Sequence, residues 1–192
     1  PQWFESLGVK TAFIGHPEAF NPAYDAPRRP DLASALHIVM LPGSRRSEIR
    51  HILPPMLAGF EMLRDSFPEI TATIPTLQRI ADRIEASCAA TASAEAISID
   101  QDEGALFRAL GSGHAVLAAS GTVTLQTALY GAPGVACYIA PALSAAIGRR
   151  LVSMDRVILP NALLGREVYP LLFQERALSL IHISEPTRRP KI

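Results

Sequence analysis

Residues 36–57 read LHIVMLPGSRRSEIRHILPPML, and a change of pattern within this stretch decides the fold. Residues 36–41 are almost all apolar and end at Pro42 and Gly43, which is typical of a strand buried on both faces of a parallel sheet. After Ser47 the apolar residues recur at the spacing of one helix face. They are Ile49, Leu53, Met56, Leu57, Phe60, Leu63 and Phe67. The stretch therefore predicts a strand followed by a helix.

Downstream of this unit, strand and helix patterns alternate. Strands are expected at residues 70–75, 96–99, 115–119 and 135–138, and helices at residues 77–88, 103–110, 122–130 and 143–152. Because parallel neighbours need a crossover connection, strands separated by helices form a parallel sheet covered on both faces. The predicted fold class is α/β, with a Rossmann-like doubly wound parallel sheet. Pro54 and Pro55 lack amide donors, so we expect the first helix to kink or restart there.

The start of the chain does not fit this alternation. Residues 11–14 read as a short strand stopped by Gly-His-Pro, and the proline-rich residues 18–34 read as a linker. Because such a strand ordinarily follows other elements, we expect an N-terminal truncation, with residues 1–17 as the end of a preceding domain.

The other end of the chain is also atypical. Residues 178–188 read LSLIHISEPTR, which is what a common transposase-based sequencing adapter encodes when it is translated in frame. A natural amphipathic tail is the alternative and would require a coincidence of sequence. We therefore expect residues 178–192 to be a non-native read-through and exclude them from reasoning about fold and function. Residues 35–177 remain as the main domain, which we expect to be incomplete.

Composition excludes several classes of protein. The chain has 192 residues, with 18 basic and 18 acidic side chains and a formal net charge of zero. Broad nucleic-acid binding is excluded, because no basic excess exists to release counterions from a phosphate backbone. Cys88 and Cys137 lack CxxC spacing, so we expect neither a zinc site nor a disulfide framework, and a reduced, cytoplasmic setting fits best. No apolar run approaches the roughly 20 residues that cross a bilayer.

Two loops after predicted strands contain residue types that bind anions. Ligands of doubly wound sheets lie beyond the carboxyl ends of the strands. In the first loop, Gly43 permits close backbone approach, Ser44 offers a hydroxyl, and Arg45 and Arg46 offer paired donors for phosphate. In the second, at residues 118–126, small residues open a helix whose free N–H groups and dipole suit a diphosphate. Together the loops favour a nucleotide site.

Each of these features also has a purely structural interpretation. Ser47 could cap the helix after the first loop, and Ser120 or Thr122 could cap the helix after the second. Asn161 could bond a sugar hydroxyl or merely hold a turn. The Asp-Gln-Asp of residues 100–102 matches a D-x-D metal pattern, but it precedes a helix start where acids complement the dipole, and capping is the favoured interpretation. No histidine shows metal-ligand spacing, so no metal is expected.

Several motifs together resemble the lipid-A-disaccharide synthase family. They are Leu-Pro-Gly-Ser-Arg at 41–45, Ala-Ala-Ser-Gly-Thr-Val-Thr-Leu at 118–125, Leu-Pro-Asn at 159–161, Gly-Arg-Glu-Val at 165–168 with Gln174, and Phe-Ile-Gly-His-Pro at 13–17. Their order and spacing also fit, from about Trp3 to Ala177. The resemblance implies a GT-B glycosyltransferase with paired Rossmann-like halves. This chain would hold the tail of the first half, the linker and most of the second, UDP-sugar-binding half.

The resemblance also implies an activity. The family joins UDP-2,3-diacylglucosamine to 2,3-diacylglucosamine 1-phosphate in an inverting transfer, releasing UDP, in the biosynthesis of lipid A and lipopolysaccharide. No cofactor is implied, because the UDP-sugar is the donor substrate. Such an enzyme would be peripheral on the cytoplasmic face of the inner membrane. The general base and acceptor site would come from the missing N-terminal domain, so this fragment is expected to be inactive alone.

The family's functional residues map onto the loops described above. The implied catalytic residues are Arg45 and Asn161, and the implied UDP-binding residues are Gly43, Ser44, Arg45, Ser120, Gly121, Thr122 and Gln126. Gln126 stands where the family usually has Glu, a partner for the ribose hydroxyls, and it cannot supply that charge. His114 replaces a usual Asp, and Ile139 replaces a usual Arg.

Other functions fit the same residues. One is another UDP-sugar GT-B enzyme, of the peptidoglycan N-acetylglucosaminyltransferase or UDP-N-acetylglucosamine 2-epimerase type. Another is a UDP-binding module without catalysis. Arg149 and Arg150 could touch anionic lipid headgroups, or they could be the ordinary basic edge of a helix.

Overall fold

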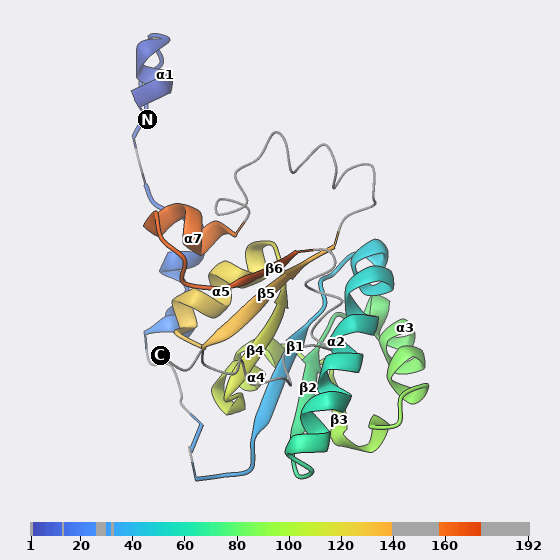
Figure 1. Cartoon of the computed structure of the whole chain (residues 1–192). Helices are drawn as coiled ribbons and strands as arrows, with labels where there is room; N and C mark the ends of the chain where they lie inside the picture. Colours follow the sequence, from blue (N-terminus) through green and yellow to red (C-terminus); the bar gives the residue numbers. More distant parts are fainter. Residues whose placement is uncertain (1, 13, 26–29, 32, 140–157, 174–192) are drawn as a thin grey trace, which may run out of the picture.

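Six parallel strands form a single sheet in the order β3-β2-β1-β4-β5-β6 (Figure 1). The computed structural model describes residues 2–12, 14–25, 30–31, 33–139 and 158–173. The strands are β1 (His37–Leu41), β2 (Thr71–Pro75), β3 (Ile97–Asp100), β4 (Ala115–Ala119), β5 (Gly134–Tyr138) and β6 (Leu171–Phe173). In the register of the central pair, Met40 of β1 lies beside Leu117 of β4. The order runs outward from β1 and β4 in opposite directions, which confirms the predicted doubly wound sheet.

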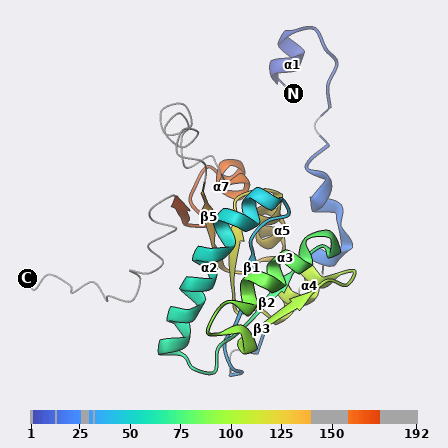
Figure 2. The ribbon, with the colours of Figure 1, turned by 90° about the vertical axis from the view of Figure 1, so that its right-hand side faces the viewer.

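Helices cover both faces of the sheet, as the turned view in Figure 2 shows. One face carries α2 (Arg46–Ser66) and α3 (Gln78–Ala89), and the other carries α4 (Ala105–Ser112) and α5 (Thr122–Tyr130). A further helix, α7 (Leu159–Leu164), packs beside α5. Two short 3-10 helices, η1 (Pro17–Phe20) and η2 (Pro22–Tyr24), lie before the sheet, and a third, η3 (Ala94–Ala96), leads into β3.

The core follows the alternation of side chains along β1. Ile38 and Met40 pack on the α2 and α3 face, whereas Val39 and Leu41 pack on the α4 and α5 face. On α2, Phe60 is fully buried against the sheet. Full burial of one such apolar side chain contributes about 1.5–3 kcal/mol, so both layers stabilise the sheet.

The strand and helix patterns of residues 36–138 predicted the elements well, with one correction in α2. The helix runs without interruption through Pro54 and Pro55, so the predicted restart is wrong. The two prolines remove donors to the carbonyls of residues 50 and 51, and both of those residues are solvent-exposed on the outer side of the helix. Water can satisfy these carbonyls, and the helix continues.

The predicted strand at residues 11–14 is also wrong. Thr11, Ala12 and Ile14 have no regular structure, and Ile14 is 76% exposed. A strand is stable only beside a partner, and no strand in the described part of the chain pairs with this segment. The preceding helix α1 (Gln2–Ser6) stands away from the sheet in Figure 1.

The predicted linker is partly docked rather than free. Tyr24 of η2 packs edge-on against Phe107 of α4, with ring centroids 5.5 Å apart. Tyr24 thereby joins the core layer between α4, α5 and the sheet. The segment that precedes the main domain therefore lies against the α4 and α5 face (Figure 2).

Several predictions fall on residues outside those described. They are the helix at residues 143–152 with Arg149 and Arg150, Gln174, and the tail at residues 178–192. Among the described helices, none combines the length and the apolar character that a membrane crossing requires.

Candidate functional site

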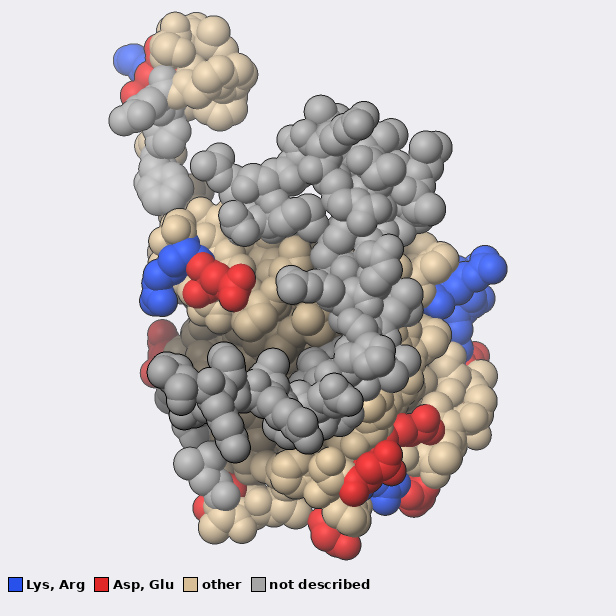
Figure 3. Space-filling view, viewed as in Figure 1, with Lys and Arg blue, Asp and Glu red and all other residues tan. Residues whose placement is uncertain are grey.

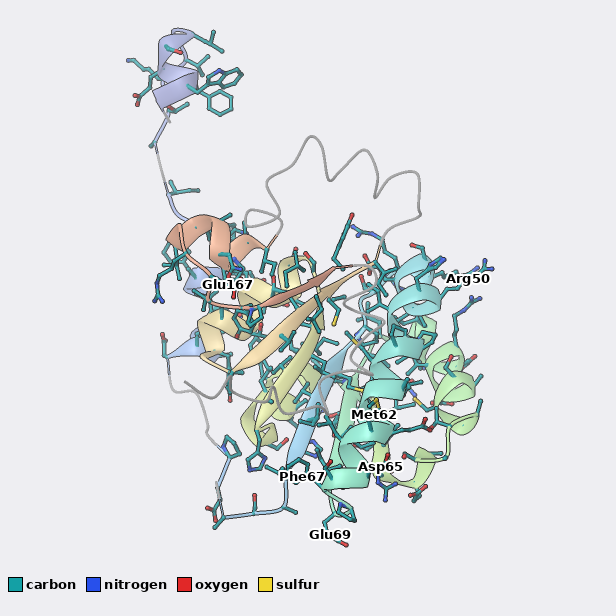
Figure 4. All side chains as sticks on the ribbon, in the orientation of Figure 1. Arg50, Met62, Asp65, Phe67, Glu69 and Glu167 are labelled. Carbon is teal, nitrogen blue, oxygen red and sulfur yellow. The ribbon has the colours of Figure 1, made fainter. Side chains whose placement is uncertain are left out.

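A pocket of about 610 Å³ lies beyond the carboxyl ends of the central strands. Its lining comes from the four loops that follow β1, β2, β3 and β4. Figure 4 labels Arg50 near the pocket end of α2, and Asp65 and Glu69 at the opposite end. In a doubly wound sheet, the crevice between the two strands that wind in opposite directions is the usual ligand site, and here those strands are β1 and β4.

Four helices begin at this pocket. Their N-cap residues Arg45, Leu77, Gly104 and Gly121 all line it, and none of the four provides a side-chain cap. The alternative interpretation, with caps at Ser47 and at Ser120 or Thr122, does not hold, because the N-caps of α2 and α5 are Arg45 and Gly121. At α2 the Glu48 side chain accepts from the Arg45 amide, whereas α3, α4 and α5 have no side-chain cap. Uncapped N-termini present unpaired N–H groups and the positive ends of helix dipoles, so the convergence of these three favours an anionic ligand.

The turn between β4 and α5 is open towards the pocket. Gly121 has φ +156° and ψ −163°, a conformation almost restricted to glycine. The backbone N–H groups of Gly121, Thr122 and Val123 make no hydrogen bond to the described part of the chain. Both Gly121 and Thr122 are exposed. Three adjacent free amides at a helix start form a cradle of the kind that binds phosphate.

The loop between β1 and α2 is held by a carboxylate from the first turn of α2. The Glu48 carboxylate accepts hydrogen bonds from the backbone N–H groups of Ser44 at 2.9 Å and Arg45 at 3.1 Å. Its other oxygen pairs with the Arg45 guanidinium at 2.8 Å. Gly43 has φ +104°, and a Cβ there would lie 2.3 Å from Glu48 Oε2. Glu48 therefore fixes the loop and holds Arg45, whose side chain is 79% exposed, beside the pocket.

Sequence reasoning missed Glu48, although a signal was present. A glutamate three residues after an N-cap often accepts a bond from the N-cap amide, as in a capping box. The capping-box pattern was not recognised because its N-cap residue is Arg45 rather than the usual Ser or Thr. Sequence reasoning also missed Thr76, whose buried hydroxyl oxygen lines the pocket without a hydrogen-bond partner among the described residues.

The Asp-Gln-Asp stretch forms an ion pair instead of a metal site or a helix cap. Arg108 binds Asp100 through both carboxylate oxygens, at 2.9 Å from Nη2 to each. Burial works against the charged form of Asp100, but the Asp102 amide and Arg108 outweigh it and lower the Asp100 pKa. The capping interpretation is corrected as well, because α4 begins at Ala105 with Gly104 as its N-cap. The described residues contain no cluster suited to holding a metal ion.

Gln126 lines the pocket and is bonded to the docked N-terminal segment. Its Nε2 donates to Glu18 Oε2 at 3.2 Å, and the Tyr24 hydroxyl donates to the same oxygen at 2.8 Å. Burial, and then the neighbouring Glu18 carboxylate, raise the pKa of Tyr24. Residues 108 positions apart in the sequence thus meet at a side chain that lines the pocket.

Asn161 is the one predicted site residue that does not line this pocket. It is buried on α7, where Oδ1 accepts from the N–H groups of Val168 and Tyr169 and Nδ2 donates to the Tyr169 carbonyl, at 2.8–3.0 Å. Of the two roles considered for this residue, the contacts favour holding a turn. The other predicted residues, Gly43, Ser44, Arg45, Ser120, Gly121, Thr122 and Gln126, are brought together at the pocket.

The remaining titratable residues of interest lie away from the pocket. His114 precedes β4 at the amino end of the sheet, where its Nδ1 accepts from the His37 amide at 3.1 Å. Burial, and then His114, lower the pKa of His37. Cys88 and Cys137 are buried free thiols, and burial raises the pKa of each to about 11.

Charge on the surface is patchy. In the space-filling view of Figure 3, Lys and Arg side chains of the described residues form small separate patches rather than a continuous basic strip on this face. The described residues on this face therefore create no broad basic field.

Comparison with known proteins identifies related sequences. A profile of the family described as lipid-A-disaccharide synthetase matches residues 1–184. The lipid-A-disaccharide synthase of Anaeromyxobacter dehalogenans (strain 2CP-C) is 37% identical over 184 residues, covering 92% of this chain and 47% of that protein. The same enzyme of Nitrobacter winogradskyi is 35% identical over 207 residues, covering 100% of this chain and 51% of that protein. The chain thus spans about half the length of the curated relatives it matches.

Among solved structures, a trehalose-6-phosphate synthase (OtsA) superposes with a TM-score of 0.41 and 15% identity, over 83% of this chain and 44% of its own. A superposition this loose says nothing about function.

Proposed function

Since the chain belongs to the lipid-A-disaccharide synthetase family, we propose that it is the UDP-sugar-binding half of an inverting glycosyltransferase of lipid A biosynthesis. The proposed donor is UDP-2,3-diacylglucosamine, the acceptor is 2,3-diacylglucosamine 1-phosphate, and the products are the lipid A disaccharide 1-phosphate and UDP. One observation carries the proposal: four helix N-termini converge on one pocket at the crossover of the sheet, and those of α3, α4 and α5 have no side-chain cap.

The pocket supplies what the leaving group needs. In an inverting displacement, negative charge grows on the departing diphosphate, and donors already fixed around it lower the barrier. We assign the free amides of residues 121–123 to the diphosphate, with Ser120 and Thr122 beside them. Arg45 supplies a positive charge, and Gly43 and Ser44 shape the loop that holds it. No cofactor is proposed, since the nucleotide arrives as part of the donor and departs as UDP when the sugar is transferred.

The rest of the reaction is assigned to the other half of the protein. The general base that activates the acceptor hydroxyl is proposed to lie in the N-terminal half, together with the acceptor site. Because both substrates carry acyl chains, we propose that the whole enzyme works at a membrane surface as a peripheral protein. The chain alone is then expected to bind UDP without catalysing transfer.

Calorimetric titration tests this proposal. UDP should bind at least about tenfold more tightly than UMP, because a second phosphate adds charge-assisted hydrogen bonds. UDP-2,3-diacylglucosamine should bind more tightly than UDP-N-acetylglucosamine, which distinguishes this function from that of other UDP-sugar enzymes. Absence of UDP binding, or equal affinity for UDP and UMP, would contradict the proposal.

A further inference from the structure

The segment at residues 16–25, which precedes the sheet domain, has a local structure of its own. Its two 3-10 helices, η1 and η2, each begin with a proline directly after a capping residue. His16 Nδ1 accepts from the Glu18 amide at 3.2 Å, and Asn21 Oδ1 accepts from the Ala23 amide at 3.0 Å. Because proline has its φ already set for a helical turn, the prolines and caps together give this docked segment a defined shape.

Within the docked segment, the Tyr24 ring packs behind one wall of the nucleotide pocket. It lies edge-on to the Phe107 ring of α4, with ring centroids 5.5 Å apart. Leu106 of α4 and Val123 of α5 pack in the same apolar layer. Leu106, Phe107 and Val123 line the pocket, whereas Tyr24 is not among the described residues that do so. Tyr24 therefore supports the wall from behind.

The Tyr24 hydroxyl reaches the second helix of this wall through a carboxylate. It donates to Glu18 Oε2 at 2.8 Å, and Gln126 Nε2 of α5 donates to the same oxygen at 3.2 Å. Burial, and then Glu18, raise the pKa of Tyr24, so the phenol keeps its proton and keeps donating throughout the neutral range. One tyrosine thus contacts α4 through its ring and α5 through its hydroxyl and Glu18.

The two helices that the docked segment joins both begin at the pocket. Their N-caps are Gly104 and Gly121, and neither start has a side-chain cap. The contacted residues lie near these starts, because Phe107 is three positions after Gly104 and Gln126 is five after Gly121, which is roughly 5–8 Å along a helix axis. Protein interiors are close-packed and transmit small shifts, so the position of the segment affects both helix starts.

We propose that docking of residues 16–25 and binding of the nucleotide are coupled. The docked segment holds the starts of α4 and α5 in the arrangement that binds the nucleotide, and the bound nucleotide in turn favours the docked segment. Tyr24 and Glu18 are positioning residues that act through Phe107 and Gln126. This inference rests on the proposed nucleotide site and concerns its regulation: occupancy of the pocket is communicated to the part of the protein that precedes the sheet domain.

Calorimetric titration of the full chain with UDP tests one direction of this coupling. Tyr24→Ala should weaken UDP binding about tenfold, which is an ordinary magnitude for coupling between two sites. Tyr24→Phe keeps the ring and loses only the bond to Glu18, so it should weaken binding about threefold. Phe20→Ala is the matched control, because Phe20 is an aromatic residue of the same segment with a side chain that is 72% exposed. It should change the affinity by no more than about twofold.

Hydrogen exchange followed by mass spectrometry tests the other direction and needs no variant. The amides of Tyr24 and Asp25 are bonded within η2 and exchange with solvent when the segment undocks and opens. Because coupling is reciprocal, saturating UDP should slow exchange at residues 17–25 by the same factor by which Tyr24→Ala weakens UDP binding. Exchange around Asp65, at the far end of α2 (Figure 4), should not change.

These measurements separate coupling from simple structural support. A segment that only stabilises the fold would exchange at the same rate with and without UDP. Unchanged exchange at residues 17–25 when UDP is bound, or equal UDP affinities of Tyr24→Ala and Phe20→Ala, would overturn the inference and leave the proposed nucleotide site standing. If the unaltered chain binds no UDP at all, the proposed function fails and the inference fails with it.

Discussion

Replacing Gly43 with alanine tests how the Arg45 loop is held. The new Cβ would lie 2.3 Å from Glu48 Oε2, 2.8 Å from its Cβ and 2.9 Å from its Cδ. Because the crowded atoms include the root of the Glu48 side chain, a rotation of its tip cannot relieve the contact. The carboxylate must leave, and with it the bonds to the Ser44 and Arg45 amides and the Arg45 ion pair.

The expected loss of stability follows from these contacts. Placing a non-glycine residue at φ +104° costs roughly 1–2 kcal/mol. Each lost amide bond contributes about 0.5–1 kcal/mol at this partly solvated site. The ion pair adds at most about 1 kcal/mol, because Arg45 is largely exposed. The total is about 2–5 kcal/mol, which for a chain of this size lowers Tm by roughly 4–20 °C.

Thermal unfolding followed by circular dichroism measures this loss. Gly165→Ala is the matched control, since Gly165 has φ +63° with no atom within 4 Å of a Cβ, and only the backbone strain applies. The double variant Gly43→Ala, Glu48→Ala should show a coupling of about 1–2 kcal/mol, because alanine at 43 has nothing left to displace. Equal losses at Gly43 and Gly165, or strict additivity with Glu48→Ala, would refute the reasoning.

Three further predictions concern other parts of the molecule. Arg45→Ala should weaken UDP binding roughly tenfold or more, whereas Arg46→Ala, outside the pocket lining, should change it less than twofold; equal affinities by calorimetry would remove Arg45 from the site. Asn161→Ala removes the three hydrogen bonds of a buried side chain and should therefore lower the free energy of unfolding by about 2–4 kcal/mol while leaving the affinity for UDP unchanged. A weaker affinity for UDP with an unaltered Tm would instead support direct contact between Asn161 and the ligand. Burial raises the Cys137 pKa from the ordinary 9.0 to about 11, so the contribution of this thiol to the stability of the folded chain is intact below pH 9 and is lost as pH rises towards 11. Cys137→Ala should therefore flatten the fall of Tm between pH 9 and 11, and parallel curves for the variant and the unaltered chain would contradict this.

The alternation of patterns was sufficient to predict the sheet and most of the pocket. Apolar runs such as residues 37–41 and 115–119, separated by helices, are typical of strands buried in a parallel sheet, and the loops after such strands meet at its carboxyl edge. The positions of Gly43, Arg45 and Gly121 at one pocket follow from this topology. These residues could be predicted because they lie in the loops directly after the apolar runs.

Other features depend on contacts that local patterns do not encode. The Glu18 bond to Gln126 joins residues 108 positions apart, and its formation depends on how Tyr24 docks on α4. The strand pattern at residues 11–14 was misleading because apolar residues form a strand only where a partner edge is available. Asn161 lay in a turn-like sequence, but its burial and its bonds to residues 168 and 169 became visible only with the folded chain.

The central claim is that the pocket between β1 and β4 binds a nucleoside diphosphate, and amide chemical-shift mapping tests it most directly. The chain, labelled with nitrogen-15, is titrated with UDP, and the shift of each backbone amide is followed. The account predicts that the largest shifts cluster at residues 121–123 and at Ser44 and Arg45, with little change around Asp65 at the far end of α2. Saturable shifts centred elsewhere, or no shifts at millimolar UDP, would contradict it.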